Sequence, residues 1–328
     1  MNILILSAGT RDKVVQYVKN ELGNSGKVIA TDSSNLAPAA YEADKFYLVP
    51  RITHEGYLEQ ILDICKKESI DGVFSLIDPE LSLLAKYRER FLAIGTTPIV
   101  SDYDIVETCF DKFKMYQLLQ KMNIKTAKCY MNAKDFYEAK SKGEIDYPVF
   151  VKPVTGSASI NINKVVCDDE LEVLFKLYDG LMIQEYMDGT EYGADVYIDM
   201  ISGKVTLIFT KEKIKMRAGE TDKSVSVKDE KLFELIVQFV EGAKGFRGMI
   251  DIDIFKINNE YYISEVNPRF GGGYPHAYEC GVNMPGEFMR NLAGMENTVT
   301  IGQYETGICM MKYNEIMIRD MKKEVLVP

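Results

Sequence analysis

Residues 248–273 read GMIDIDIFKINNEYYISEVNPRFGGG, and this stretch decides the fold of the second half of the chain. Two apolar runs, 248–256 and 261–265, flank the polar pair Asn258-Asn259, which predicts two antiparallel strands joined by a tight turn. Residues 190–209 alternate in the same way and predict a hairpin upstream. Together with interspersed amphipathic helices, these strands predict an α+β module.

Polar side chains occupy alternate positions on the two strands. Residues two apart on a strand face the same side, so Asp251 with Asp253, and Glu265 with Asn267, direct oxygen atoms to one surface. Mg²⁺ prefers carboxylate and amide oxygens, and the pattern therefore predicts a magnesium platform. The alternative is the exposed polar face of an antiparallel sheet.

Arg269 and three glycines, Gly271 to Gly273, follow the second strand directly. A guanidinium beside a metal site can neutralise charge that develops on a transferring phosphoryl group. Three successive glycines are costly in chain entropy, which favours a turn that admits an anionic substrate closely.

Two earlier segments carry further candidate ligands for a nucleotide. The apolar strand 149–152 ends in Lys152 and is followed by the small residues 155–159, which predicts either a phosphate-binding lid or a plain turn. Residues 182–191, MIQEYMDGTE, predict a strand that leads into a bend, where a purine could bond to the backbone and Glu191 to ribose hydroxyls. An ordinary strand and turn with exposed acids is the alternative.

The first hundred residues alternate short apolar strands with amphipathic helices, beginning with 2–6 and 11–22, which predicts a doubly wound parallel sheet. The turn after the first strand lacks G-x-G-x-x-G, so a nicotinamide or flavin role is not expected. Asp78 and Glu80 fall at the carboxyl end of the fourth strand. They either help to hold a substrate or only stabilise the start of the next helix.

Composition excludes several classes of function. The net charge of −10 and the absence of a basic cluster argue against nucleic-acid binding, and Lys211 to Arg217 is expected to be a solvated basic stretch. Six scattered cysteines and two histidines argue against a zinc site and favour buried free thiols. No apolar stretch is long enough to span a bilayer and no leader segment is apparent, so we expect a cytoplasmic protein without a membrane partner.

Four motifs, taken in order, resemble those of the ATP-grasp superfamily over most of residues 105–295. They are V-K-P with its small-residue loop, Q-E-Y-M-x-G-x-E, D-I-D, and E-V-N-P-R with G-G. The nearest branch is carbamoyl-phosphate-synthase-like and amino-acid-ligase-like. The resemblance implies an α/β and α+β chain, in which a doubly wound pre-ATP-grasp domain (1–105) precedes an ATP-grasp fold. That fold divides into a lid and nucleotide-binding subdomain (106–189) and a metal and catalytic subdomain with a C-terminal extension (190–328).

The resemblance also implies roles for individual residues. Lys112 and Lys152 match the two nucleotide lysines, and the metal ligands correspond to Asp253, Glu265 and Asn267, with Asp251 on the same face. Arg269 resembles the arginine beside the transferred phosphate. Arg217 resembles a substrate or phosphate contact, with a mobile basic loop as the alternative. The remaining nucleotide contacts would be Ser157, Gln184, Glu185, Tyr186, Met187 and Glu191.

The implied activity is an ATP-dependent carboxylate–amine ligase, in which the carboxylate attacks the γ-phosphate and an amine displaces the acyl phosphate. ATP and Mg²⁺, with Mn²⁺ as a substitute, would be the cofactors, small carboxylates and amines the partners, and a homodimer is compatible with the family. His276 either acts as a base or only supports the site. The alternatives are a carbamoyl-phosphate-synthase-like phosphotransferase or carboxylating ligase, and a non-catalytic ATP-binding regulatory module.

Overall fold

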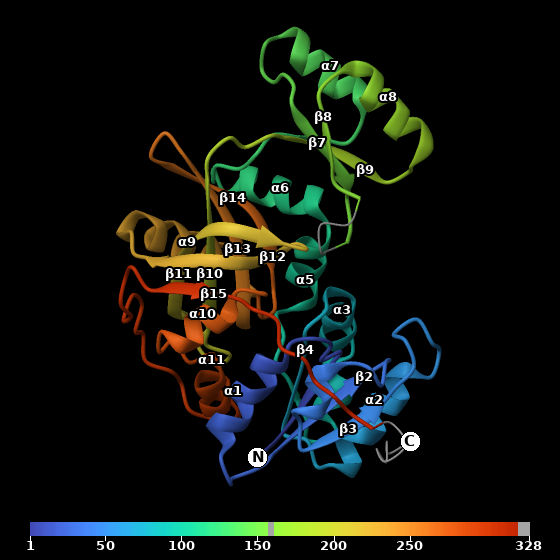
Figure 1. Cartoon of the computed structure of the whole chain (residues 1–328), viewed down its shortest axis with the longest axis vertical. Coiled ribbons are helices and arrows are strands. Elements are labelled where there is room, and N and C mark those ends of the chain that lie inside the picture. Colours follow the sequence, from blue (N-terminus) through green and yellow to red (C-terminus); the bar gives the residue numbers. More distant parts are fainter. Residues whose placement is uncertain (157–160, 321–328) are drawn as a thin grey trace.

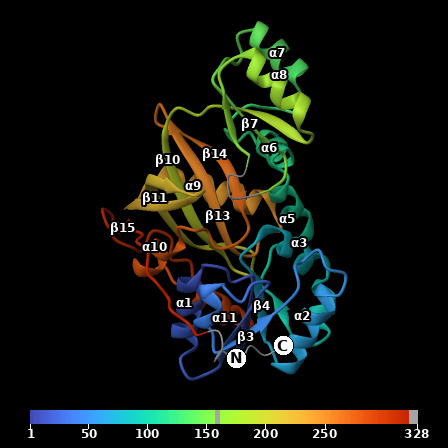
Figure 2. The ribbon, with the colours of Figure 1, turned by 45° about the vertical axis from the view of Figure 1, so that its right-hand side comes forward.

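Figure 1 shows the computed structural model of the chain, which describes residues 1–156 and 161–320. A parallel-sheet domain lies at the bottom, a large antiparallel sheet lies in the middle, and a small sheet with two helices lies at the top. The turned view in Figure 2 shows the same three layers. This arrangement confirms the expected combination of α/β and α+β parts.

The N-terminal domain is a five-stranded parallel sheet in the order β3-β2-β1-β4-β5, as the strand and helix rhythm predicts. Its central strands are buried on both faces because helices cover them. The strands are β1 (Asn2–Leu6), β2 (Lys27–Asp32), β3 (Lys45–Leu48), β4 (Gly72–Ser75) and β5 (Thr97–Pro98). The connecting helices are α1 (Asp12–Leu22), the 3-10 helix η1 (Pro38–Tyr41), α2 (Tyr57–Lys67), α3 (Asp78–Lys86) and α4 (Arg88–Leu92).

Asp32, at the end of β2, holds the loops at the carboxyl edge of this sheet. Its carboxylate accepts hydrogen bonds from the backbone N–H groups of Gly9 (2.9 Å) and Ser34 (2.9 Å). Arg11 lies in the same turn, immediately before α1, and is thereby directed away from the sheet toward the rest of the chain.

The small upper sheet is antiparallel, in the order β6-β9-β7-β8. Strand β6 is short. The backbone before it makes single hydrogen bonds to β9 and β14, through the carbonyls of Lys128 and Lys125, and no ladder. The elements are α5 (Tyr103–Phe110), α6 (Lys112–Lys121), β6 (Cys129–Tyr130), α7 (Ala133–Ser141), β7 (Val149–Pro153), β8 (Asn163–Val165), α8 (Asp168–Leu177) and β9 (Leu181–Glu185).

The middle sheet has six antiparallel strands in the order β14-β13-β10-β11-β12-β15. The pair predicted from residues 248–273 is its β13–β14 edge. The strands are β10 (Thr190–Ile198), β11 (Val205–Arg217), β12 (Glu220–Val227), β13 (Gly248–Ile257), β14 (Glu260–Asn267) and β15 (Cys309–Met311). The helices packed with them are α9 (Glu230–Ala243), α10 (Tyr274–Glu279) and α11 (Met284–Leu292).

The basic stretch 211–217 corrects one expectation. Its first part is not solvated, because it continues β11 and the side chains of Lys211 and Lys213 are only 1% and 4% exposed, whereas residues 214–217 are exposed as expected. Each lysine is tolerated in the interior because it is paired with carboxylates of neighbouring strands. Strands β12 and β15, which sequence patterning did not predict, complete the sheet on this side.

All six cysteines lie in the described ranges and none forms a disulfide. Cys65, Cys109 and Cys129 are buried as expected, whereas Cys167 and Cys309 are exposed. Within residues 1–156 and 161–320, no helix has the length and apolar character that crossing a membrane requires.

Candidate active site

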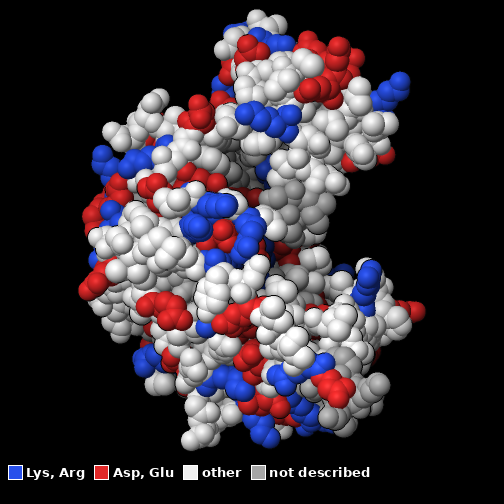
Figure 3. Space-filling view, viewed as in Figure 1, with Lys and Arg blue, Asp and Glu red and all other residues white. Residues whose placement is uncertain are grey.

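A pocket of about 450 Å³ opens where the three parts of the chain meet. The space-filling view in Figure 3 shows the molecule hollowed between its upper and lower parts. Strands β7 and β9 contribute one wall, β10, β11, β13 and β14 another, and the edge of the parallel sheet a third. The predicted site residues on its walls are Lys152, Gln184, Glu185, Met187, Glu191, Asp253, Glu265, Asn267 and Arg269, together with Asp78 and Asp251.

The four polar residues of β13 and β14 face the pocket together. Asp253 lies opposite Glu265 and Asp251 opposite Asn267 in the strand register, so all four side chains share one face of the sheet. Burial and the neighbouring Asp253 and Asp195 raise the pKa of Asp251. The sheet therefore concentrates negative charge and oxygen ligands at this point.

This donor set fits a magnesium ion that is shared with phosphate groups. Glu265 has no hydrogen-bond or ion-pair partner among the described residues, and its neighbours across the sheet also present oxygen atoms. Within the described ranges, no cluster of three His, Cys, Asp or Glu side chains is arranged to hold a metal alone. Mg²⁺ usually retains waters and binds one or two carboxylates plus substrate phosphates, which matches such a partial shell.

Lys213 of β11 was missed in the sequence, and it joins two of the predicted ligands. Its ammonium group pairs with Glu191 (2.8 Å) and also with Asp253. Burial lowers the pKa of Lys213, but Asp253 and Glu191 outweigh this effect and raise it above its usual value. The spacing of Lys211 and Lys213, two residues apart on one strand, was the signal that could have identified a pair of inward cations.

Lys152 ends in the pocket as a buried cation. It is the fourth residue of β7 and only 5% exposed, and its ammonium group makes no hydrogen bond or ion pair with the described residues. Burial, with a further contribution from Lys112, lowers the pKa of Lys152, whereas Glu265 raises it. An anionic ligand in the pocket would compensate this isolated charge.

The end of β9 and the bend after it place their residues in different ways. The Glu185 carboxylate accepts from the backbone N–H of Lys128 (3.0 Å), while Met187 lines the pocket from the following turn. Tyr186 is not on the pocket wall, because its ring packs against Phe150 and beneath the ammonium of Lys164.

Two predicted nucleotide contacts, Lys112 and Ser157, are not among the described residues of the pocket wall. Lys112 begins α6, outside the pocket wall, and its ammonium donates to the carbonyl of Gly156 in the small-residue loop. Ser157 falls outside the described residues.

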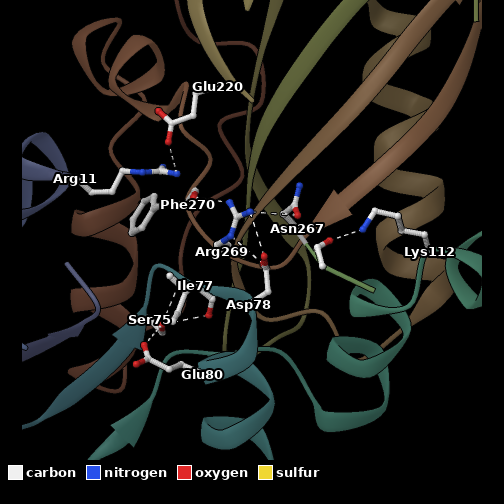
Figure 4. Close-up of polar contacts among 11 residues, drawn as sticks. Arg11, Ser75, Ile77, Asp78, Glu80, Lys112, Glu220, Asn267, Arg269 and Phe270 are labelled. Carbon is white, nitrogen blue, oxygen red and sulfur yellow. Dashed lines mark hydrogen bonds and ion pairs between the residues drawn. The ribbon is translucent and has the colours of Figure 1, made fainter. Parts of the chain in front are cut away.

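Arg269 is held by hydrogen bonds to the N-terminal domain and to its own neighbours in sequence. Its Nε donates to the Asp78 carboxylate (2.9 Å), and its other nitrogens donate to the Phe270 carbonyl (3.1 Å) and the Asn267 side chain (3.3 Å), as Figure 4 shows. Burial would lower the pKa of Arg269, but Asp78 and two further acids raise it. Asp78 thus orients Arg269, and it makes no side-chain cap at the start of α3.

Glu80 serves the interior of the N-terminal domain instead. It is 1% exposed, and its carboxylate accepts from the hydroxyl groups of Ser7, Ser75 and Tyr57. Burial raises its pKa despite these bonds. Glu80 does not line the pocket, and therefore only Asp78 of this pair is placed to affect a ligand there.

The three glycines after Arg269 are needed for packing within the protein. A β-carbon on Gly271 would lie 2.4 Å from the Asp251 carboxyl carbon, one on Gly272 2.7 Å from that of Glu220, and one on Gly273 2.7 Å from the Lys211 side chain. The expectation that the glycines admit a substrate is thus incomplete, because charged side chains of the protein already occupy the space beside them. Gly272 and Gly273 also line the pocket.

Arg217 is not brought to the pocket wall. It ends β11, where its guanidinium pairs with Asp222 (2.9 Å) and is 49% exposed, so the alternative of a mobile loop does not describe it either. Its catalytic role stays a prediction. Arg11 lines the pocket together with Arg269; sequence reasoning missed Arg11, which pairs with Glu220 (2.7 Å).

His276 is buried away from the pocket. Its Nε2 lies 3.0 Å from the Ile308 carbonyl and its Nδ1 2.7 Å from the Ser224 hydroxyl. Because a carbonyl only accepts, Nε2 carries the proton and Nδ1 accepts from Ser224. His276 thereby ties the C-terminal segment to β12 and supports the fold rather than contacting a ligand.

We expect His276 to make the protein less stable in mild acid. Burial, with Lys211 nearby, lowers the pKa of His276 from 6.5 to about 4. Between these values the unfolded chain takes up a proton that the folded chain does not. The free energy of unfolding therefore decreases as the pH is lowered, by up to about 3 kcal/mol. Urea unfolding of His276→Gln at pH 7.5 and 5 should show a smaller loss in acid than the wild type. His54→Gln, at an exposed site, is the control; an equal loss in all three proteins would contradict the prediction.

Comparison with known families agrees with this geometry. A model of the ATP-grasp domain matches residues 109–273, which is half of the chain, and a model of the PylC-like N-terminal domain matches residues 3–99. The chain belongs to the ATP-grasp family. The expected carbamoyl-phosphate-synthase-like resemblance and the expected type of enzyme, an ATP-dependent carboxylate–amine ligase, are confirmed at the level of the family.

Individual relatives of this ATP-grasp chain are distant. A carbamoyl-phosphate synthase of Methanobrevibacter smithii is 26% identical over 90% of this chain and 81% of its own length. Coenzyme gamma-F420-2:alpha-L-glutamate ligase of Methanococcus maripaludis is 29% identical over 52% of this chain and 63% of its own length. Among solved structures, the biotin carboxylase domain of 2-oxoglutarate carboxylase from Hydrogenobacter thermophilus superposes with a TM-score of 0.75 over 94% of this chain and 73% of that one. Its 18% identity shows the fold alone.

Proposed function

We propose that this ATP-grasp enzyme activates a small carboxylate with Mg·ATP and joins it to an amine. One observation carries the proposal. Lys152, Glu265, Asn267 and Arg269 line a single pocket. Within the described chain, neither the Lys152 ammonium nor the Glu265 carboxylate makes a hydrogen bond or a close ion pair, although the negative charge of Glu265 raises the pKa of Lys152. A buried cation and a half-buried carboxylate that lack direct partners are costly unless a ligand pairs with them. A metal nucleotide supplies a phosphate for the lysine and a metal ion for the carboxylate.

The residues divide into a nucleotide end and a reacting end. Glu185 and Met187 would border the adenine, Glu191 the ribose, and Lys152 the phosphates, with Gln184 and Tyr186 supporting this wall. Lys112 and Ser157 would act from the small-residue loop. Asp253, Glu265 and Asn267 would hold Mg²⁺, or Mn²⁺, which when bound neutralises charge on the phosphate oxygens.

At the reacting end, Arg269 would hold the substrate carboxylate against the γ-phosphate. The carboxylate oxygen attacks phosphorus, the bond to the β-phosphate breaks, and ADP and an acyl phosphate result. The amine then attacks the acyl carbon and phosphate leaves. The protein contributes position and fixed charge, because Asp78 keeps the guanidinium oriented and charged.

The relatives described above support this class of enzyme and differ from one another in their substrates. The relatives include a carbamoyl-phosphate synthase and a glutamate ligase, and the similar biotin carboxylase domain was solved as a dimer with MgADP, ADP and bicarbonate. We therefore also propose ATP and Mg²⁺ as the cofactors of this chain, small molecules as its substrates, and a homodimer as its assembly.

The test is release of ADP by purified protein with MgATP. Amino acids and sugar carboxylates are supplied in turn, each with a mixture of amines, and products are identified by mass spectrometry. We expect at least one pair to give ADP, phosphate and an amide, and Lys152→Met to give none. Binding of ATP without ADP release from any pair would favour a regulatory module, and ADP release with bicarbonate alone would favour a carboxylating enzyme.

A further inference from the structure

The pocket has a second cationic position, contributed by the N-terminal domain. Arg11, Leu76 and Ile77 reach it from the edge of the parallel sheet, opposite Glu220 and Gly272 of the middle sheet. This end lies next to α1, whereas Lys152 enters from β7 in the upper part of the chain (Figure 1). A ligand that fills the pocket therefore meets Arg11 at the end remote from the nucleotide lysine.

Arg11 is incompletely bonded, in contrast to Arg269. Its Nη2 pairs with Glu220 (2.7 Å), but its Nη1 is buried and has no acceptor among the described residues. Burial, with Arg269 nearby, lowers the pKa of Arg11, although Glu220, Asp251 and Asp78 act in the opposite direction. A buried guanidinium N–H without an acceptor is unfavourable, and a carboxylate matches the geometry of its two donors.

Glu220 can release Arg11 without becoming unpaired. Its second carboxylate oxygen pairs with Lys312 (2.9 Å), which the C-terminal segment brings to the pocket rim next to β15. A ligand carboxylate can consequently take the place of Glu220 on the Nη2 of Arg11, while Glu220 keeps Lys312. Three cations, Arg11, Arg269 and Lys312, here face three carboxylates, Asp78, Glu220 and Asp251, so a ligand carboxylate on Arg11 takes the position of one of these acids.

The two arginines therefore hold different groups. Figure 4 shows Arg269 between Asp78 and Asn267, beside the metal-ligand face, and Arg11 on the opposite side with Glu220. If Arg269 holds the carboxylate that is activated, the anion on Arg11 belongs to the other substrate.

We propose that Arg11 determines specificity for an amine substrate that bears a carboxylate, as an amino acid does. The proposal rests on the proposed ligase function. Arg11 holds the carboxylate of the amine substrate. The ammonium group of the same substrate then lies among the carboxylates of Asp78, Glu220 and Asp251. After one proton leaves to solvent, the amine attacks the acyl carbon, the C–N bond forms and the C–O bond to phosphate breaks. The second proton leaves with the phosphate.

The experiment measures binding apart from turnover. Full-length protein with Mg²⁺ and ADP is titrated calorimetrically with each of the common L-amino acids and with the corresponding amino-acid amides, which lack the α-carboxylate. We expect at least one amino acid to bind, its amide to bind about tenfold more weakly or worse, and Arg11→Ala to show the same loss for the acid but not for the amide. Arg11→Lys should recover part of the affinity.

Arg51→Ala is the matched control, because Arg51 is an exposed arginine of the same domain and should leave binding unchanged. ADP affinity should be the same in all variants, which also shows that they are folded. Equal binding of acid and amide, or an Arg11→Ala protein with wild-type affinity for the acid, would overturn the proposal, as would the absence of binding by every amino acid. Failure of the ligase function would appear separately, as amino-acid binding that depends on Arg11 without amide formation.

Discussion

Glu265→Gln should lower the rate of ADP formation by about three orders of magnitude. The change keeps the shape of the side chain but removes one negative charge from the face that would hold Mg²⁺, where such a charge contributes several kcal/mol to the transition state. Asp253 cannot fully replace it, because Lys213 already neutralises that carboxylate. The measurement is ADP release as a function of Mg²⁺ concentration with the carboxylate and amine found in the screen.

The matched control is Glu260→Gln on the same strand. Glu260 is exposed at the start of β14, where it pairs with Lys125 far from the pocket wall. This variant should retain the wild-type rate. We further expect Glu265→Gln to need more Mg²⁺ for half-maximal rate. A Glu265→Gln enzyme with an unchanged rate and an unchanged magnesium requirement would contradict the metal assignment.

Lys211→Met should lower the free energy of unfolding by about 3–5 kcal/mol. Lys211 and Asp195 pair across neighbouring strands, and each side chain is only 1% exposed. Removal of one partner leaves the other charge buried without compensation, which is among the costlier single changes in a protein interior. Urea unfolding followed by circular dichroism measures the loss.

The double variant Lys211→Met, Asp195→Asn separates this effect from simple loss of packing. Its stability should be closer to that of the wild type than the stability of Lys211→Met, because no buried charge remains unpaired. Lys125→Met, which breaks the exposed pair with Glu260, should change stability little. Equal losses for the single and double variants would show that the pair itself is not what stabilises this part of the sheet.

The polar face of β13 and β14 was predictable because it depends only on residue spacing within one short stretch of sequence. Asp253, Glu265 and Asn267 lie on strands that are neighbours in sequence, and the two-residue period of a strand decides which side chains share a face. The same reasoning applied to the parallel sheet, since the alternation of strands and helices indicates its topology. These parts of the fold and site follow from spacing alone.

The predictions from sequence were wrong or incomplete where the burial and contacts of a residue depend on a partner far away in the chain. The basic stretch that begins at Lys211 resembles a solvated surface in sequence, yet carboxylates from β10 and β13 make its burial possible. Arg217 and Arg11 are equally ordinary in sequence. Only the packing of the N-terminal domain against β12 brings Arg11 into the pocket, and only the pairing with Asp222 draws Arg217 away.

By itself, the sequence determined the two sheet types, the family and the row of carboxylate and amide side chains on β13 and β14, because each depends on periodicity or on motifs within a few residues. The tertiary structure alone decided which cations meet those ligands: Lys213 beside Asp253, Arg269 against Asp78, and Arg11 against Glu220. The physical reason is that an ion pair between segments as far apart as residues 78 and 269 produces no periodic pattern in the sequence of either segment. It forms only when whole domains pack and bury the charges together.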